Sequence, residues 1–213
     1  MNGTPMVRAG WIEVITGCMF AGKSEEAIKR ITKEQYSRER HVVVFIPQKA
    51  RRRVTMSNAE EIDTAGKVVS RSGKVIECVE FDETTPWEIV RKLSPGVTTV
   101  VIEEAHFCDN ELVKVCKHLA EKCKIRVIVI GLDQTFDEEP FGPMPALMAE
   151  AEYVTKELAT CTECGSQNAS KSWLDSRALD NVQEGKILVG DKQYRAVCRH
   201  CYGRLADKYP KKN

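Results

Sequence analysis

The sequence predicts an α/β fold class, with a mostly parallel sheet in one domain and a small metal-binding lobe after it. Short runs rich in Val and Ile alternate along the chain with segments of helical periodicity. The runs are almost entirely apolar, as expected for strands that helices cover on both faces of a parallel sheet. A glycine-rich loop of the phosphate-binding type follows the first run, and two C-x-x-C pairs lie near the C-terminal end.

The predicted strands and helices follow one another in order. The strands, each a nearly continuous apolar run, are Ile12–Thr16, His41–Ile46, Thr98–Ile102 and Ile125–Ile130, with Val75–Val79 as a weaker candidate. The helices, recognised by their helical apolar spacing, are Ser24–Ser37, Pro86–Leu93 and Asp109–Cys123. Asp109 is a suitable N-cap because its side chain can accept the first free N–H groups of a helix. The alternation stops near Leu158, where we expect the sheet to end.

The length of 213 residues allows one domain of ordinary size and a small appendage. We expect a flexible N-terminus over residues 1–10, a phosphate-loop (P-loop) domain over 11–158, a zinc-binding lobe over 159–203 and a flexible polar tail over 204–213. The lobe is marked by a shift to Ser, Asn, Asp, Gly and Cys, and the tail by its lysines.

Charge and hydropathy exclude several classes of protein. Lys and Arg number 32 against 31 Asp and Glu, a net charge of +1, which argues against a globally basic nucleic-acid binder and a polybasic membrane-surface protein. No apolar run reaches the roughly 18 residues of a spanning helix, and no secretory signal is recognisable. We therefore expect a cytoplasmic protein with no membrane or nucleic-acid partner. The odd number of cysteines, nine, fits metal binding in a reducing compartment better than a disulfide framework.

A complete G-x-x-x-x-G-K-[ST] motif lies between the first predicted strand and the first predicted helix. Its residues are Gly17, Cys18, Met19, Phe20, Ala21, Gly22, Lys23 and Ser24. In such a loop the backbone N–H groups and the positive end of the helix dipole bind phosphates. The lysine reaches the β and γ oxygens and the hydroxyl binds Mg2+. The motif predicts a site for ATP and Mg2+.

Two carboxylates, Glu103 and Glu104, end the predicted strand Thr98–Ile102. Neighbouring side chains of a strand point to opposite sides, so one carboxylate can serve the Mg2+ while the other faces a nucleophile, either water or a substrate hydroxyl. We group Glu103, Ala105 and His106 with the ATP and Mg2+ site, and give His106 no catalytic role because a lone histidine is more often structural.

Cys161, Cys164, Cys198 and Cys201 form two C-x-x-C pairs. Four thiolates predict a closed structural zinc site with no open position for catalysis. The metal would tie down both ends of a long loop, and we expect it to act separately from the phosphate loop, which belongs to the sheet. The other cysteines are interpreted as small buried residues, except Cys18, which is a candidate for oxidation.

The segment Gly131–Pro145 leaves the end of a predicted strand, where α/β sheets bind ligands. It contains Phe136 and Phe141, which could enclose a planar base or could equally anchor a loop in the core.

Together these motifs resemble the thymidine kinases of the zinc-containing cellular and bacterial type. The resemblance rests on the phosphate loop, Glu-Glu-Ala-His-Phe after the carboxylate strand, Gly-Leu-Asp followed by Glu-Pro-Phe-Gly-Pro-Met-Pro, then Ala-Glu-Tyr-Val-Thr-Lys, and knuckles ending Cys-Arg-His-Cys-Tyr. It covers about Ile12 to Tyr202. It implies a RecA-like domain, a zinc-anchored lasso that closes over a nucleoside, a homotetramer, and feedback inhibition by thymidine triphosphate.

The resemblance also implies roles for single residues. Glu104 matches the general base for the 5′-hydroxyl, and Tyr194 matches a lasso tyrosine near the nucleoside. The other residues matched to the nucleoside site are Met19, Leu132, Phe136, Phe141, Lys186, Ile187, Leu188 and Val189. The chain departs from the family pattern at Glu103, His106, Arg51–Arg53, Asp137–Glu138 and Lys171–Trp173.

The implied activity is ATP-dependent phosphorylation of thymidine, and of deoxyuridine, at the 5′-hydroxyl, a salvage step for DNA synthesis. The residues alone leave alternatives open. One is a P-loop ATPase with a zinc lobe, in which Glu104 activates water. A second is a zinc-ribbon nucleic-acid binder that uses Arg51–Arg53. A third is a catalytically weakened family member with a shifted nucleoside preference.

Overall fold

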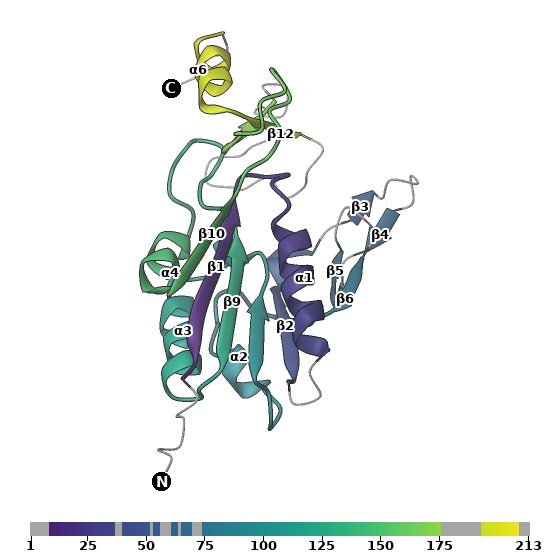
Figure 1. Cartoon of the computed structure of the whole chain (residues 1–213), viewed down its shortest axis with the longest axis vertical. Helices are drawn as coiled ribbons and strands as arrows, with labels where there is room; N and C mark the ends of the chain where they lie inside the picture. The colour runs from purple at the N-terminus through teal and green to yellow at the C-terminus, as the bar shows by residue number, and fades with distance from the viewer. Residues whose placement is uncertain are drawn as a thin grey trace, which may run out of the picture.

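The computed structural model describes residues 9–36, 40–51, 53–55, 61–63, 65–69, 74–175 and 193–208. Within them a six-stranded sheet forms the centre of the molecule (Figure 1). In spatial order its strands are β10 (Tyr153–Glu157), β1 (Trp11–Gly17), β9 (Arg126–Gly131), β8 (Thr99–Ile102), β2 (Val42–Pro47) and β7 (Val79–Phe81). Every pairing between them is parallel. The predicted α/β class with a mostly parallel sheet is confirmed.

Helices cover both faces of the sheet. The central strands carry apolar side chains on both faces, and each face packs against helices. Helix α1 (Lys23–Gln35) covers one face, where its Ala27 and Ile31 share a core with Ile128 and Ile130. The other face carries α2 (Glu88–Arg91), α3 (Glu111–Glu121) and α4 (Met144–Glu150) (Figure 1). This arrangement places the carboxyl ends of all parallel strands at one edge.

Some element boundaries differ from the prediction. Helix α3 has Asn110 at its N-cap position, yet the Asp109 carboxylate still accepts the N–H of Glu111 at 2.8 Å. The weak strand candidate Val75–Val79 divides into β6 (Val75–Glu77) and β7, separated by Cys78, whose N–H donates to the carbonyl of Gly66. Strand β10 was not predicted, because three of its five residues are exposed at the sheet edge and the segment lacks an apolar run.

Two small antiparallel pairs lie beside the sheet, between β2 and β7 in the chain (Figure 1). They pair β3 (Arg53–Thr55) with β4 (Glu61–Asp63), and β5 (Lys67–Val69) with β6. Two short 3-10 helices, η1 (Gln48–Ala50) and η2 (Ala105–Phe107), follow the carboxyl ends of β2 and β8.

The C-terminal lobe lies beyond the carboxyl edge of the sheet (Figure 1). It contains the antiparallel pair β11 (Lys171–Leu174) and β12 (Tyr194–Val197), followed by helix α6 (Arg199–Lys208). The helix continues past residue 203, so residues 204–208, expected in a flexible tail, are helical.

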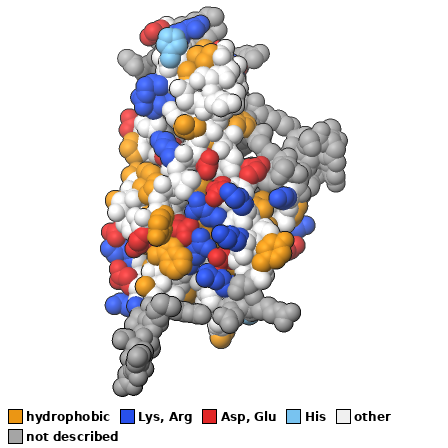
Figure 2. All heavy atoms as spheres, viewed as in Figure 1, with side chains coloured by type: hydrophobic (Ala, Val, Ile, Leu, Met, Phe, Trp, Pro, Cys, Tyr) orange, Lys and Arg blue, Asp and Glu red, His pale blue; other side chains and the backbone are white. Residues whose placement is uncertain are grey.

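The surface carries both signs of charge. On the face shown in Figure 2, Lys and Arg side chains are interspersed with Asp and Glu. Among the helices of the described residues, none is both long and apolar enough for a membrane span.

Candidate active site

The phosphate loop leaves β1 at the carboxyl edge and enters α1. Gly17 has φ 136°, and a Cβ there would lie 2.2 Å from the carbonyl oxygen of Glu157, so only glycine fits. Gly22, at the N-cap of α1, is left-handed with φ 85°. These two glycines turn the chain so that the first N–H groups of α1 face the edge where a phosphate would bind.

Lys23 joins two parts of the phosphate loop. Its ammonium donates to the carbonyl of Cys18 at 2.7 Å. Burial lowers the pKa of Lys23, and the charges of Glu104, Cys18 and Glu103 partly oppose this effect. A phosphate oxygen would replace the Cys18 carbonyl as a stronger, charged partner for the same ammonium.

Glu103 is almost fully buried, with 3% of its surface exposed. Its Oε2 accepts the N–H of Glu104 at 3.2 Å, while its Oε1 is buried and has no hydrogen-bond partner among the described residues. Burial and the neighbouring charge of Glu104 raise the pKa of Glu103 to about 7, against the lowering effects of the Ser24 hydroxyl and of Lys23.

The donors present at this point fit Mg2+. A buried carboxylate oxygen without a partner, beside a hydroxyl, offers the hard oxygen ligands that Mg2+ takes in phosphate-transfer sites. A divalent cation would also remove the cost of burying the ionised Glu103.

Glu104 is held in an uncommon backbone conformation at the start of η2. Its φ of 50° and ψ of 36° lie in the left-handed region, which costs a non-glycine residue free energy and is frequent at functional sites. Its side chain is 19% exposed, and its charge acts on Lys23. The chain therefore turns Glu104 away from the line of β8 and toward the phosphate loop.

The imidazole of His106 lies beside the carboxylate of Glu104. The N–H of Leu132 donates to Nδ1 of His106 at 3.2 Å, so Nε2 is the nitrogen that carries the proton. This Nε2 lies 3.6 Å from Oε2 of Glu104, slightly beyond hydrogen-bond distance, and such contacts often shorten when substrate binds. A role in orienting Glu104 was not expected from the sequence, because the contact depends on β9 lying beside β8.

The imidazole of His106 is fixed by packing. Its ring centroid lies 4.2 Å from that of Phe107 and 4.5 Å from that of Phe141. A Cβ on Gly142 would approach the carbonyl oxygen of His106 to 2.4 Å, so the glycine allows close contact. Leu132 and Phe141, which the resemblance matched to the base pocket, thus contact the histidine that faces Glu104.

A second apolar group lies between the phosphate loop and the lobe. Leu174 and Tyr194 are buried there, with the partly buried residues Met19, Phe20 and Phe136 packed against them. The rings of Phe136 and Tyr194 are 6.4 Å apart at 54°. Met19, Phe136 and Tyr194, matched to the nucleoside site from three distant segments, are therefore brought together. Leu174 was missed. Lys186, Ile187, Leu188 and Val189 lie outside the described residues.

The four predicted zinc ligands form one cluster. The sulfur atoms of Cys161, Cys164, Cys198 and Cys201 all lie within 4.8 Å of one another. The Cys164 and Cys198 sulfurs are 3.8 Å apart, close to the edge of about 3.8 Å in a tetrahedron with Zn–S bonds of about 2.3 Å. Although burial opposes it, N–H groups of Cys198, Glu163 and Cys164 lower the pKa of Cys161 to about 6, which favours the thiolate that a metal binds.

The lobe and the phosphate loop are in direct contact, contrary to their expected independence. Cys18 and Ala21 belong to the same buried core as Cys161, Cys198 and Tyr202 of the lobe. The N–H of Met19 donates to the hydroxyl of Ser172 at 3.0 Å, and the Cys18 thiol donates to the carbonyl of Ala169 at 3.3 Å. The lobe and the phosphate loop therefore share one packed interface.

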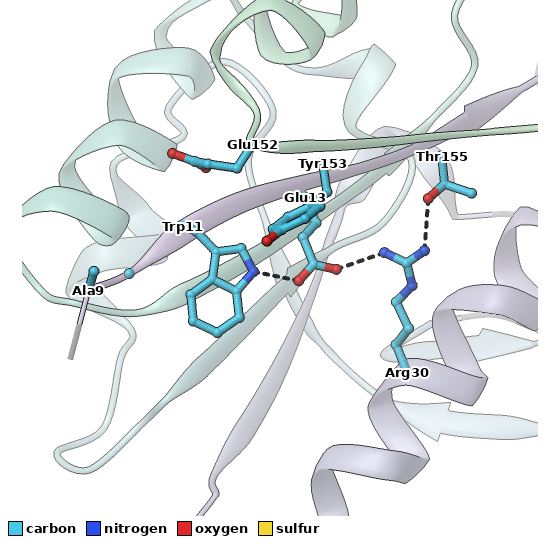
Figure 3. Close-up of a pocket in the computed structure, with 8 residues that line it drawn as sticks. Ala9, Trp11, Glu13, Arg30, Glu152, Tyr153 and Thr155 are labelled. Carbon is cyan, nitrogen blue, oxygen red and sulfur yellow. Dashed lines mark hydrogen bonds and ion pairs between the residues drawn. The ribbon is translucent and has the colours of Figure 1, made fainter. Parts of the chain in front are cut away.

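A cavity of about 620 Å³ lies at the opposite, amino end of the sheet (Figure 3). It is lined in part by Trp11, Glu13, Arg30, Tyr153 and Thr155. Arg30 donates to Glu13 at 2.7 Å and to Thr155 at 2.9 Å, so its charge already has partners within the protein. The phosphate loop and the carboxylate pair are at the other edge, and this cavity is not part of the candidate site.

The phosphate loop, the carboxylate pair and the aromatic cluster lie together at the carboxyl edge of the sheet. The thymidine kinase family model matches residues 10–202. The match extends from just before β1 to Tyr202 in α6, and the cysteine cluster fits the zinc site of the cellular and bacterial type. The chain therefore belongs to the thymidine kinase family.

Proposed function

We propose that this nucleoside kinase transfers the γ-phosphoryl group of ATP to the 5′-hydroxyl of thymidine. The observation that carries the proposal is the position of Glu104. It follows the central strand β8, its charge acts on Lys23 of the phosphate loop, and its Oε2 lies 3.6 Å from Nε2 of His106. A base in this position serves proton abstraction beside a bound phosphate.

In the proposed reaction Glu104 accepts the proton of the 5′-hydroxyl. The bond from the 5′-oxygen to the γ-phosphorus forms while the bond from that phosphorus to the bridging oxygen of ADP breaks. Lys23 and the loop N–H groups stabilise the charge on the phosphoryl oxygens. His106 keeps the Glu104 carboxylate oriented through its Nε2 proton, so the base loses little freedom when substrate binds.

Ser24 and Glu103 are the residues that would hold Mg2+, for which the unpartnered Oε1 of Glu103 is suited. When bound, Mg2+ would supply positive charge that offsets part of the charge of the phosphates. With Glu103 assigned to the metal, Glu104 is the carboxylate assigned as the base.

The nucleoside is proposed to lie beside Phe136 and Tyr194. The cluster formed with Met19, Phe20 and Leu174 is apolar and lies next to the phosphate loop, so a base held there would direct its ribose toward the loop. Deoxyuridine, which lacks only a methyl group, is expected to be a slower or weaker substrate, since one methyl group is worth about 1–3 kcal/mol in an apolar pocket. Both reactions would serve deoxynucleotide salvage for DNA synthesis.

The resemblance supports further proposals about assembly and control. We propose a homotetramer. We also propose inhibition by thymidine triphosphate, which carries a pyrimidine and a triphosphate. Met19 belongs to the phosphate loop and packs against the apolar cluster, so one ligand could occupy both places. We also propose a reducing, cytoplasmic setting, in which the four clustered cysteines would remain available to a metal.

The test is to incubate the protein with Mg-ATP and a panel of nucleosides and to identify the monophosphate formed. Thymidine should give the 5′-monophosphate fastest, with deoxyuridine second and no hydrolysis of ATP in the absence of nucleoside. Nucleoside-independent release of phosphate would instead favour the ATPase, with water as the acceptor. If only another nucleoside gave a monophosphate, the kinase activity would stand and thymidine would be rejected as the substrate.

A further inference from the structure

The loop between β9 and α4 carries Phe136, and it is closed by its own backbone. Gln134 and Pro140 form an isolated antiparallel bridge. The N–H of Thr135 donates to the carbonyl of Glu139 at 2.9 Å, and the N–H of Phe141 donates to the carbonyl of Asp133 at 3.1 Å. Residues 133–141 therefore form a small hairpin, called here the acceptor hairpin, whose position depends on contacts with the rest of the protein.

Two side chains of the lobe contact this hairpin. The Lys171 ammonium donates to the Gln134 side-chain oxygen and forms an ion pair with Glu138, both at 2.9 Å. The Tyr202 hydroxyl donates to the carbonyl of Phe136 at 2.8 Å. Lys171 thus joins the two sides of the hairpin, and Tyr202 contacts its tip.

Lys171 is unusual because its ammonium is buried. Its side chain is 6% exposed, whereas that of Glu138 is 40% exposed. A buried ammonium is costly unless it is paired and hydrogen-bonded, so Lys171 favours conformations in which the hairpin supplies both partners. Glu138 itself has a left-handed φ of 67°, a conformation that costs free energy. Its ion pair with Lys171 is placed to offset that cost.

The direction of the side chains separates Lys171 from the apolar cluster. Successive residues of a strand point to opposite sides. On β11, Ser172 contacts Met19 and Leu174 lies in the cluster with Phe136 and Tyr194. Lys171 points away from that side, toward the hairpin. It can therefore influence the cluster through the position of Phe136.

We propose that Lys171 is a positioning residue for nucleoside binding. By joining Gln134 and Glu138 it holds the acceptor hairpin against the lobe, and so holds the Phe136 ring beside Tyr194. The identity of the ligand rests on the proposed function. Without the ion pair, the hairpin must be ordered when nucleoside binds, which weakens affinity for the nucleoside and leaves the chemistry at Glu104 unchanged.

The first test compares steady-state kinetics of Lys171→Met, Glu138→Gln and the double variant. Lys171→Met should raise the thymidine KM about tenfold, with kcat and the ATP KM changed less than about twofold. Glu138→Gln should raise it by about threefold. The double variant should resemble Lys171→Met alone, because both changes remove one interaction. Lys171→Arg, which keeps the charge, should recover most of the affinity.

Lys117→Met is the matched control, since Lys117 forms an exposed ion pair with Glu150 at 2.8 Å and should leave the kinetics unchanged. A wild-type thymidine KM in Lys171→Met overturns the proposal, as does an additive rise in the double variant. If Lys171→Met binds no zinc or melts at assay temperature, Glu138→Gln alone decides, because its exposed side chain can be changed without unfolding.

A measurement without ligand separates this proposal from the proposed function. Hydrogen exchange at the Thr135 and Phe141 amides should be faster in Lys171→Met than in the wild type and in Lys117→Met. Unchanged exchange overturns the role of Lys171 even in an active thymidine kinase. Faster exchange in a protein that phosphorylates no nucleoside supports the positioning role of Lys171 and rejects the proposed substrate.

Discussion

The two ends of the central sheet treat a buried carboxylate in opposite ways. At the amino end, Glu13 of β1 accepts from Arg126 at 2.7 and 2.9 Å. It also accepts from Arg30 and from the Trp11 indole (Figure 3). Although burial opposes it, these donors lower the pKa of Glu13. At the carboxyl end, Glu103 keeps an oxygen without a partner and has its pKa raised to about 7.

The difference shows what each end is suited to do. Paired charges at the amino end stabilise the fold and leave little affinity for a ligand. At the carboxyl end, the buried Glu103 oxygen without a partner costs stability, and a bound cation would offset that cost. The same residue type therefore indicates structure in one place and function in the other, according to its partners.

The largest expected effect is on turnover at the carboxyl end. Glu104→Gln should lower kcat about 100-fold or more, because an amide of equal size cannot accept the proton. ATP and thymidine affinities should change little. Glu13→Gln, the matched change at the amino end, should keep kcat within about twofold. Steady-state kinetics at saturating substrate distinguish them, and a Glu104→Gln enzyme with half the wild-type rate would make Glu104 structural.

The second effect is on stability at the amino end. Glu13→Gln should lower the free energy of unfolding by about 2 kcal/mol at pH 7, since Arg126 and Arg30 lose a buried charged acceptor. The folded pKa of Glu13 is below the unfolded value of 4.5, so its contribution exists above pH 4.5 and is lost as the pH falls. Urea unfolding at pH 7 and below pH 4 should show the difference shrinking, and an equal loss at both would contradict it.

Loss of zinc should weaken substrate binding at the carboxyl edge and leave the amino end of the sheet unchanged. Cys198→Ser should raise the thymidine KM about tenfold, and the ATP KM by a smaller factor of about three, because Cys18 and Ala21 share the core of the lobe. Zinc analysis with paired titrations tests this, and Cys123→Ser, at an exposed cysteine, is the control. An ATP KM equal to that of the wild type would mean that ATP binding at the phosphate loop does not depend on the zinc-binding lobe.

The smallest expected effect is a gain in stability. In Mg2+-free buffer at pH 8, Glu103→Gln should stabilise the protein by about 1 kcal/mol. The folded pKa of about 7 exceeds the unfolded value of 4.5, so the wild type loses stability as the pH rises between them, and the advantage of the variant should shrink toward pH 5. Thermal unfolding of both proteins at pH 8 and at pH 5 measures this difference in stability. A variant less stable than the wild type at pH 8 would mean that Glu103 is adequately partnered.

Local patterns were sufficient for much of the architecture. The strands β1, β2, β8 and β9 were predicted because each is covered on both faces and therefore apolar throughout, which a short window of sequence reveals. Strand β10 was not, because at an edge one side of the strand meets water and its residues are mixed. The phosphate loop and the cysteine pairs were likewise visible, since their chemistry requires fixed residue types at fixed spacing.

The contacts that join distant segments were decided only by the tertiary structure. Nothing near His106 in the chain indicates that the Leu132 N–H fixes its tautomer, or that its proton faces Glu104. The burial of Lys171 against Glu138 and the shared core of lobe and phosphate loop are of the same kind. Sequence by itself determined which elements form and which groups can do chemistry, because those depend on neighbours along the chain. Packing decided which partners each group meets, because burial and charge pairing depend on residues far away in sequence.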